Sequence, residues 1–308
     1  MKICIIGTGA MGSVYAALLA AAGNEVWAVD RWADHIAAIR KNGLKIDGKS
    51  GDRTVPLNAT MDTTEVGSCN LVIIATKAMD VAQAAESAKA LLGQETDVLT
   101  IQNGLGSSER VAGILGTKRV IVGIAGGFGA SIEAPGHVHH CGMEFVHLGE
   151  LDNPVTPRLE KVATVWRNAG FNVTTYDNID QLIWEKLICN VCFSGTCALT
   201  EMTIGAVLKD DNAWRVASGC AAEAFHVAGA YGVSIGFDDP IDFARNFGAR
   251  IPDARPSMLL DLLAGRPSEI DVINGAIPVQ GRKCGMPTPF NTVVSALVRA
   301  KEARLGLC

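Results

Sequence analysis

The sequence predicts an α/β protein of two domains, an N-terminal doubly wound domain with a parallel sheet and an all-helical C-terminal domain. The chain has 308 residues, about the length of two domains. In the first half, short apolar strand-like runs alternate with helical runs, and from about residue 180 onward almost every segment has a helical pattern. We therefore expect the domains to span residues 1–178 and 179–308.

Composition limits the classes of partner. Apolar residues make up 48% of the chain and charged residues 19%, which is ample for two cores. The net charge is −5 and no basic run is interleaved with aromatic residues, so we expect no nucleic-acid partner and no membrane partner. Nine cysteines without a disulfide-like spacing predict reduced thiols and a cytoplasmic location. Whether the chain forms a homodimer stays open.

The elements of the first domain follow from short apolar runs. Such runs are continuous in parallel strands that are covered on both faces. They predict strands at residues 2–6, 25–29, 71–75, 97–101 and 119–124. Helices are expected at residues 10–22, 80–92 and 107–115. Partial alternation over residues 137–150 predicts an antiparallel extension of the sheet.

The second domain is expected to consist of helices. Their predicted spans are residues 180–199, 210–231, 256–265, 268–284 and 288–305. The last span begins with Thr288 and Pro289, a capping hydroxyl followed by proline at the first helical position.

A glycine motif joins the first strand to the first helix. Gly7, Gly9 and Gly12 have the G-x-G-x-x-G spacing, in the strand-to-helix context that a dinucleotide site requires. Gly7 permits the tight turn, Gly9 lets the backbone approach a pyrophosphate, and Gly12 allows close packing of helix on strand. With Ala10 and Met11 at the helix N-terminus, these residues are the predicted binding site for the cofactor phosphates.

The second strand ends in Asp30 and Arg31. An acidic residue at this place binds the adenosine ribose hydroxyls and favours NAD, whereas an arginine commonly meets the 2′-phosphate of NADP. Arg31 could also stack on the adenine without any phosphate. The pair favours NAD and leaves NADP open.

A row of polar residues crosses an apolar helical segment. Lys186, Asn190 and Ser194 are spaced four apart, so they share one helix face. Buried polar groups need partners, and a bound substrate is one source of them. A nicotinamide enzyme that reduces a ketone also needs a proton donor. The alternative is a lysine that extends to solvent and two satisfied core residues.

A second segment, residues 255–277, carries Ser257, Asp261, Glu269 and Asn274 among apolar residues. A carboxylate near a partly buried lysine would hold that lysine in place and keep it protonated. The alternative is that Ser257 and Ser268 cap helices while Glu269 lies on a solvated face.

Four segments together resemble the ketopantoate reductase (2-dehydropantoate 2-reductase) family. They are the glycine motif, "TKAMD" with Lys77, "IQNGLG" with Asn103, and the pair W-x-K-L-x-x-N and S-M-x-x-D-x-x-x-G-R-x-x-E-I-D-x-x-N-G. The resemblance implies a Rossmann domain followed by a helical domain, with substrate in the cleft between them. It also implies NAD(P)H-dependent reduction of a small 2-oxo acid, in pantothenate biosynthesis, with NADP the usual cofactor.

The resemblance also implies residue roles. Lys186 matches the catalytic lysine that protonates the carbonyl oxygen as hydride arrives, and Glu269 matches the acid that binds a substrate hydroxyl and supports catalysis. The remaining matches are Asn103 near the nicotinamide and the lysine, Lys77 at the cofactor cleft, and Asn190 and Ser257 as substrate-binding positions, Ser257 towards the carboxylate. Asn274 is a further candidate for substrate binding.

Two residues depart from the family pattern. Ser194 stands where the family usually has a second asparagine that contacts substrate, and a lost hydrogen bond of this kind costs about 1–3 kcal/mol. Asp30 departs from the family's preference for NADP. A bulkier 2-oxo acid, oxidation of a 2-hydroxy acid with NAD, and a nucleotide-binding sensor without catalysis therefore remain as alternatives.

Clusters of histidine and cysteine do not predict a metal site. The histidines at 137, 139, 140 and 147 and Cys141 lie on strand-like segments without the ordered spacing of a structural zinc site. Cys189, Cys192 and Cys197 are expected to be small buried residues of a helix.

Overall fold

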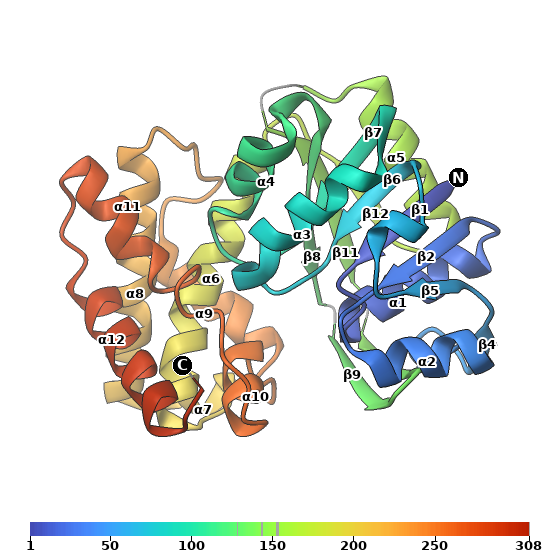
Figure 1. Cartoon of the computed structure of the whole chain (residues 1–308). Helices are drawn as coiled ribbons and strands as arrows, with labels where there is room; N and C mark the ends of the chain where they lie inside the picture. Colours follow the sequence, from blue (N-terminus) through green and yellow to red (C-terminus); the bar gives the residue numbers. More distant parts are fainter. Residues whose placement is uncertain (128, 143, 152–153, 308) are drawn as a thin grey trace. The chain divides into compact units, whose positions relative to one another are not determined.

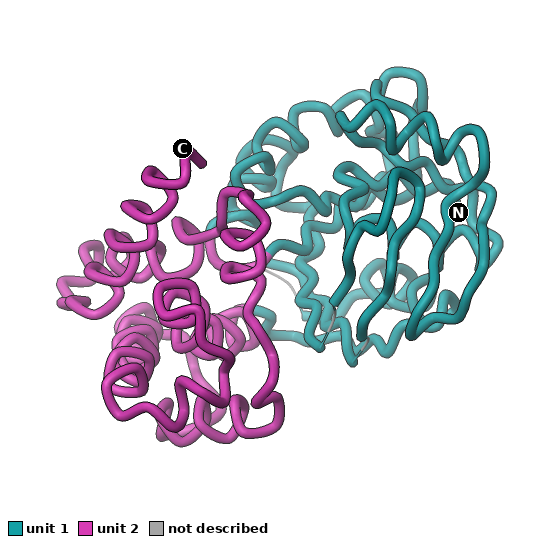
Figure 2. The backbone as a smooth tube through the Cα atoms, turned by 90° about the horizontal axis from the view of Figure 1, so that it is seen from below, with its two compact units in different colours: residues 1–102, 106–179 teal, residues 103–105, 180–308 magenta. Residues whose placement is uncertain are grey.

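The computed structural model describes residues 1–127, 129–142, 144–151 and 154–307. They form two compact units (Figure 2): unit 1 contains residues 1–102 and 106–179, and unit 2 contains residues 103–105 and 180–308. Each unit has its own cluster of buried apolar side chains. The short loop 103–105 thus belongs with the C-terminal helices, although unit 1 flanks it in the sequence.

Unit 1 is built on an eight-stranded sheet with the order β12-β11-β8-β7-β6-β1-β2-β5. The six strands from β8 to β5 run parallel, and β11 pairs antiparallel with β8. This confirms the doubly wound fold. The strand order reverses between β1 and β6, and ligands bind at the carboxyl ends of strands at such a point. The strands are β1 (Lys2–Ile6), β2 (Glu25–Val29), β5 (Asn58–Thr60), β6 (Cys69–Ile74), β7 (Leu92–Thr100), β8 (Val120–Gly126), β11 (Phe145–Glu150) and β12 (Val173–Thr175).

Helices cover this sheet (Figure 1). Helices α1 and α5 meet through Tyr15 and Trp166, whose ring centroids are 5.0 Å apart, and α3 and α4 contact each other. The helix expected at residues 80–92 is shorter than predicted, because a 3₁₀ helix follows Ala88 and β7 begins at Leu92. The α-helices are α1 (Ala10–Ala21), α2 (Ala33–Asn42), α3 (Val81–Ala88), α4 (Ser107–Leu115) and α5 (Pro157–Asn168), and the 3₁₀ helices are η1 (Thr63–Glu65), η2 (Ala78–Asp80), η3 (Lys89–Leu91) and η4 (Thr117–Arg119).

A second sheet, which the sequence did not predict, has the order β4-β3-β10-β9. It comprises β3 (Leu44–Gly48), β4 (Arg53–Val55), β9 (Gly129–Ala134) and β10 (His137–Gly142). The prediction for residues 137–150 is therefore correct for β11 and wrong for β10, which pairs with β3 and β9 instead. The buried side chains of Ile46 and Val138 drive this pairing because they complete the core of unit 1. Residue 143 of the segment lies outside the described residues.

Unit 2 is helical throughout its described secondary structure. Its helices are α6 (Ile179–Thr200), α7 (Ile204–Lys209), α8 (Asp211–Ala230), α9 (Pro240–Arg250), α10 (Ser257–Leu263), α11 (Ala276–Cys284) and α12 (Pro289–Arg304). Helix α6 is long and apolar enough to cross a membrane by length and composition alone. However, 67% of its apolar window is buried inside the protein, as in the core helix of a globular domain.

Two predictions for unit 2 were wrong. Helix α11 begins at Ala276 rather than at Ser268, and residues 269–275 form turns whose Val272 carbonyl accepts the Leu105 N–H at 2.9 Å. Pro289 does occupy the first turn of α12, but the cap is not the Thr288 hydroxyl. Instead, the buried Glu223 carboxylate of α8 accepts the first backbone N–H groups of α12, at 2.7 and 2.9 Å.

Candidate active site

The glycine motif forms the tight turn that the sequence predicts. Gly7 has a φ of 92°, and a Cβ atom there would lie 2.6 Å from the Thr76 nitrogen, just after β6. A Cβ atom on Gly12 would lie 2.0 Å from the Gly7 carbonyl oxygen. Both positions therefore require glycine, because any side chain would displace the turn or the helix.

Gly9 lies differently, since a Cβ atom there would meet nothing within 4 Å. The first hydrogen bond of α1 runs from Ser13 N to Gly9 O at 2.8 Å, which leaves the N–H groups of Ala10, Met11 and Gly12 without acceptors inside the helix. No side chain among the described residues caps this N-terminus. The open side of Gly9 and the uncapped helix fit the diphosphate of a nicotinamide dinucleotide.

Charged residues surround this turn at the carboxyl edge of the sheet. Asp30 follows β2, is partly exposed, and accepts the Trp32 N–H at 3.0 Å. Arg31 is exposed and pairs with Asp80, with 2.8 Å between Nη2 and Oδ2. Lys77 is exposed and directly precedes η2, the 3₁₀ helix that follows β6. The predicted cofactor residues of unit 1 thus lie at the ends of three neighbouring strands.

Gln102 supports this edge, and the sequence analysis did not single it out. Its Nε2 donates to the carbonyls of Ile74 and Thr76, at 2.6 and 3.2 Å, and so holds the loop after β6. On the same loop, Arg110 Nη1 donates to the Ala78 carbonyl at 3.2 Å. The only signal in the sequence was the place of Gln102 directly before Asn103 in "IQNGLG".

Unit 2 contains a hydrogen-bonded row of three predicted residues. Lys186 Nζ donates to Asn103 Oδ1 at 2.9 Å, and Asn103 Nδ2 donates to Glu269 Oε2 at 3.3 Å. The amide therefore turns its oxygen to the cation and its nitrogen to the carboxylate, which is the favourable orientation for both.

Burial makes the lysine of this row less basic. It lowers the pKa of Lys186 from 10.5 to about 8, while the negative charge of Glu269 acts in the opposite direction. The lysine side chain is still partly exposed, and Glu269 is only 7% exposed. A lysine with such a pKa can exchange a proton at near-neutral pH, as a general acid or base must.

The backbone fixes the position of Asn103. Leu105 N donates to the Val272 carbonyl at 2.9 Å. Gly104, which lies between Asn103 and Leu105, has a φ of 80°. A Cβ atom on Gly104 would lie only 2.1 Å from the Val272 carbonyl oxygen. The loop can approach the turn at residues 269–275 only because residue 104 has no side chain.

The other predicted substrate residues have different surroundings. Asn190 is partly exposed one turn after Lys186 on α6, Ser194 is 4% exposed on the next turn, and Ser257 is exposed at the start of α10. Asn274 is completely buried, and its Nδ2 donates to the Val191 carbonyl and to Asn291 Oδ1, at 2.8 and 3.0 Å. The Asn274 side chain thus joins α6 to α12, and its role in substrate binding stays a prediction.

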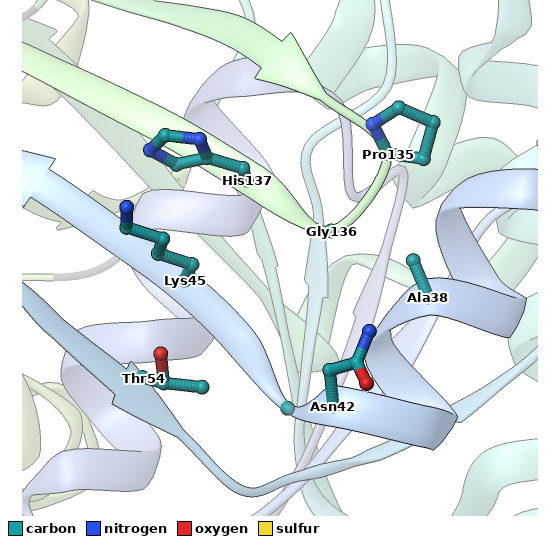
Figure 3. A pocket seen from close by; sticks show the side chains of 8 residues that line it. Ala38, Asn42, Lys45, Thr54, Pro135, Gly136 and His137 are labelled. Atoms are coloured by element: carbon teal, nitrogen blue, oxygen red, sulfur yellow. The ribbon is translucent and has the colours of Figure 1, made fainter.

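The histidines of β10 take part in a different interaction. His137 Nε2 and His139 Nδ1 bond to the two oxygens of Asp47, at 2.6 and 2.5 Å. Within the described part of the chain, no three side chains of His, Cys, Asp or Glu are placed to hold a metal ion. The pocket beside them has a volume of about 240 Å³ and contains none of the predicted site residues (Figure 3). It is lined by Ala38, Asn42, Gly43, Lys45, Thr54, Pro135, Gly136 and His137.

Comparison with known proteins gives matches along nearly the whole chain. The family model described as ketopantoate reductase PanE/ApbA matches residues 3–153, and the model of the C-terminal part of the same family matches residues 178–302. The chain is 32% identical, over all 308 residues of both, to a 2-dehydropantoate 2-reductase of Streptococcus pyogenes serotype M6. It is 32% identical to one of Pyrococcus abyssi, with 99% of each chain covered.

Two solved structures have the same fold over the whole chain. A ketopantoate reductase from Ralstonia eutropha has a TM-score of 0.91 and 32% identity, with 99% of this chain and 100% of that chain covered. A ternary complex of D-mandelate dehydrogenase with NADH and anilino(oxo)acetate also has a TM-score of 0.91, with 29% identity and full coverage of both chains.

Proposed function

Because this chain belongs to the ketopantoate reductase family, we propose that it reduces a 2-oxo acid to the corresponding 2-hydroxy acid with NADH. It is an NAD(P)-dependent oxidoreductase that acts on CH–OH groups. The observation that carries the proposal is the row Lys186–Asn103–Glu269, in which a lysine of lowered pKa is held by a neutral amide.

Lys186 is the proposed proton donor. When bound, the reduced nicotinamide supplies the hydride for the ketone carbon. As the carbonyl oxygen gains negative charge, the Lys186 ammonium stabilises it and transfers a proton to it. Asn103 Oδ1 orients the ammonium at 2.9 Å. Glu269 is held at the far end of the amide, where its carboxylate can accept a hydrogen bond from a substrate hydroxyl.

Unit 1 supplies the proposed cofactor contacts. The uncapped N-terminus of α1, with Gly7, Gly9, Ala10, Met11 and Gly12, would hold the diphosphate. Asp30 would accept hydrogen bonds from the adenosine ribose hydroxyls, which favours NAD(H) over NADP(H). Lys77 is exposed at the same edge and would lie near the phosphates.

Ketopantoate is the first substrate to test, because the curated relatives carry that activity in their names. Asn190 and Ser257 are proposed to bind the substrate, Ser257 at the carboxylate. A second candidate is an NAD-dependent 2-hydroxy acid dehydrogenase with a bulkier substrate. Ser194 favours it, since serine is shorter than asparagine and leaves more room. The similar structure of D-mandelate dehydrogenase, which contains NADH and anilino(oxo)acetate, also supports this candidate.

A substrate panel tests the proposal. Initial rates are measured on ketopantoate and on branched and aromatic 2-oxo acids, each with NADH and with NADPH. Lys186→Ala should lower kcat about 10³-fold or more and leave the Kd for NADH within about twofold. Unchanged turnover in this variant contradicts the assignment of Lys186. Cofactor binding without turnover of any 2-oxo acid would support a nucleotide-binding sensor instead.

A further inference from the structure

Three charged side chains lie at the edge of unit 1 where β2 and β6 end. Asp30 and Arg31 follow β2, and Asp80 ends the 3₁₀ helix η2 after β6. The Arg31 guanidinium is 77% exposed and lies 2.8 Å from the Asp80 carboxylate, which is 27% exposed. Asp30 accepts the Trp32 N–H at 3.0 Å and does not form this ion pair.

Asp80 is the fixed member of the ion pair. Its backbone N–H donates to the Lys77 carbonyl at 3.0 Å. The same loop is held by Gln102 at the Thr76 carbonyl and by Arg110 at the Ala78 carbonyl, each at 3.2 Å. The long Arg31 side chain is exposed to solvent along most of its length. Asp80 therefore determines where the guanidinium lies.

This arrangement treats the two dinucleotides differently. A 2′-phosphate brings close to two negative charges and is best bound by an arginine fork. To meet it, Arg31 would have to leave Asp80, so binding of the phosphate would cost this ion pair. The ribose diol of NADH adds no charge and needs only an acceptor, which Asp30 supplies. An exposed ion pair contributes little to stability, so removing this one should leave the fold intact.

We propose that Asp80 determines cofactor selectivity: its ion pair with Arg31 withholds that guanidinium from a 2′-phosphate and makes the site selective for NAD(H). The proposal rests on the proposed function only in requiring that the chain binds a nicotinamide dinucleotide. Asp80 acts here through Arg31 and is a positioning residue, not a catalytic one.

The test measures the Kd of NADH and of NADPH by nicotinamide fluorescence, without substrate. The proteins are the wild type, Asp80→Asn, Arg31→Ala and the double variant. Asp80→Asn should tighten NADPH binding about 5- to 10-fold and change NADH binding less than about twofold. In the Arg31→Ala background the same change should gain less than about twofold for NADPH. Asp52→Asn removes the same charge from an exposed loop before β4 and should leave both constants unchanged.

Three results would overturn the proposal. The first is tighter binding of NADPH than of NADH by the wild type. The second is an unchanged NADPH affinity in Asp80→Asn. The third is an equal gain with and without Arg31, which would mean that Asp80 acts directly on the phosphate. A chain that binds NADH selectively but reduces no 2-oxo acid contradicts the proposed function alone, because the binding test needs no turnover.

Discussion

Lys186 Nζ lies 2.9 Å from Asn103 Oδ1, so a neutral amide orients this lysine on its helix. A carboxylate at that distance would favour the charged form of the lysine and raise its pKa. Glu269 is placed one hydrogen bond further along the row. The pKa of Lys186 can therefore stay at about 8, because burial outweighs the attraction of Glu269.

The first prediction concerns the pH dependence of the two reaction directions. Reduction needs the protonated lysine, so kcat/KM for the 2-oxo acid should fall as pH rises through about 8. Oxidation of the 2-hydroxy acid needs the neutral amine, so its kcat/KM should rise through the same pH. Initial rates in both directions check this, and two profiles that bend in the same direction would contradict it.

Replacing Asn103 by aspartate should move that pH profile. A carboxylate at this position would contact the ammonium directly and raise the pKa of Lys186 above its value of about 8. Reduction by Asn103→Asp should then persist to higher pH, and oxidation should slow by about tenfold near pH 8. Asn103→Ala is the control: it should lower kcat about 10- to 100-fold through lost orientation. If the pH profile of Asn103→Asp does not move, the side chain at position 103 does not influence the pKa of Lys186.

Gly104 and Gly106 form a matched pair that tests how the Asn103 loop is held. Both have a positive φ, 80° and 91°, so alanine strains the backbone at either position. Only at Gly104 would the new Cβ meet the Val272 carbonyl, at 2.1 Å, whereas Gly106 faces open space. Gly104→Ala should lower kcat at least about tenfold more than Gly106→Ala. Equal losses would show that backbone strain alone matters.

Gly9 and Gly12 separate cofactor binding from folding. Alanine at Gly12 would clash with the Gly7 carbonyl at 2.0 Å, so Gly12→Ala should unfold several degrees lower. Alanine at Gly9 meets no protein atom within 4 Å. Gly9→Ala should keep the wild-type Tm within about 2 °C and weaken NADH binding about tenfold or more, since the methyl group occupies the space of the diphosphate. Unweakened binding in Gly9→Ala would place the diphosphate elsewhere.

Local patterns predicted the elements that depend on local sequence. Strands β1 and β2 and helix α4 have their predicted bounds. A continuous apolar run, and a periodic run that ends before a glycine, are recognisable without knowing their neighbours. The glycine spacing also predicted that Gly7 and Gly12 need to lack a side chain at the turn after β1.

The features that were missed depend on contacts between distant residues. Strand β10 pairs with β3, far away in the sequence, and no pattern in residues 137–142 names that partner. The segment after Ser268 has a helical pattern, but its turn is held by Leu105 from a distant loop. The core hydrogen bonds of Asn274 to α6 and α12 also join distant residues, so the sequence alone did not indicate them.

The lowered pKa of Lys186 also has a consequence for folding. The folded state has a pKa of about 8 and the unfolded chain one of about 10.5, so between these values the unfolded state binds more protons. Stability from this group must therefore rise with pH across that window, and the full cost of the buried ammonium is present below it. In Lys186→Met the apolar side chain fills the same space and cannot titrate.

The free energy of unfolding of the wild type, measured by urea titration, should thus increase relative to that of Lys186→Met as pH rises from about 7 to about 10. The variant should lose turnover because it has no proton donor, and it should keep its affinity for NADH. Its stability need not fall, because a residue selected as a proton donor need not stabilise the fold. Lys89→Met, which removes an exposed lysine of unit 1 that pairs with Glu86, is the control for the loss of a lysine side chain. A constant difference between wild type and Lys186→Met would mean that Lys186 titrates as an ordinary lysine, and the amide at Asn103 would then orient a permanently charged ammonium.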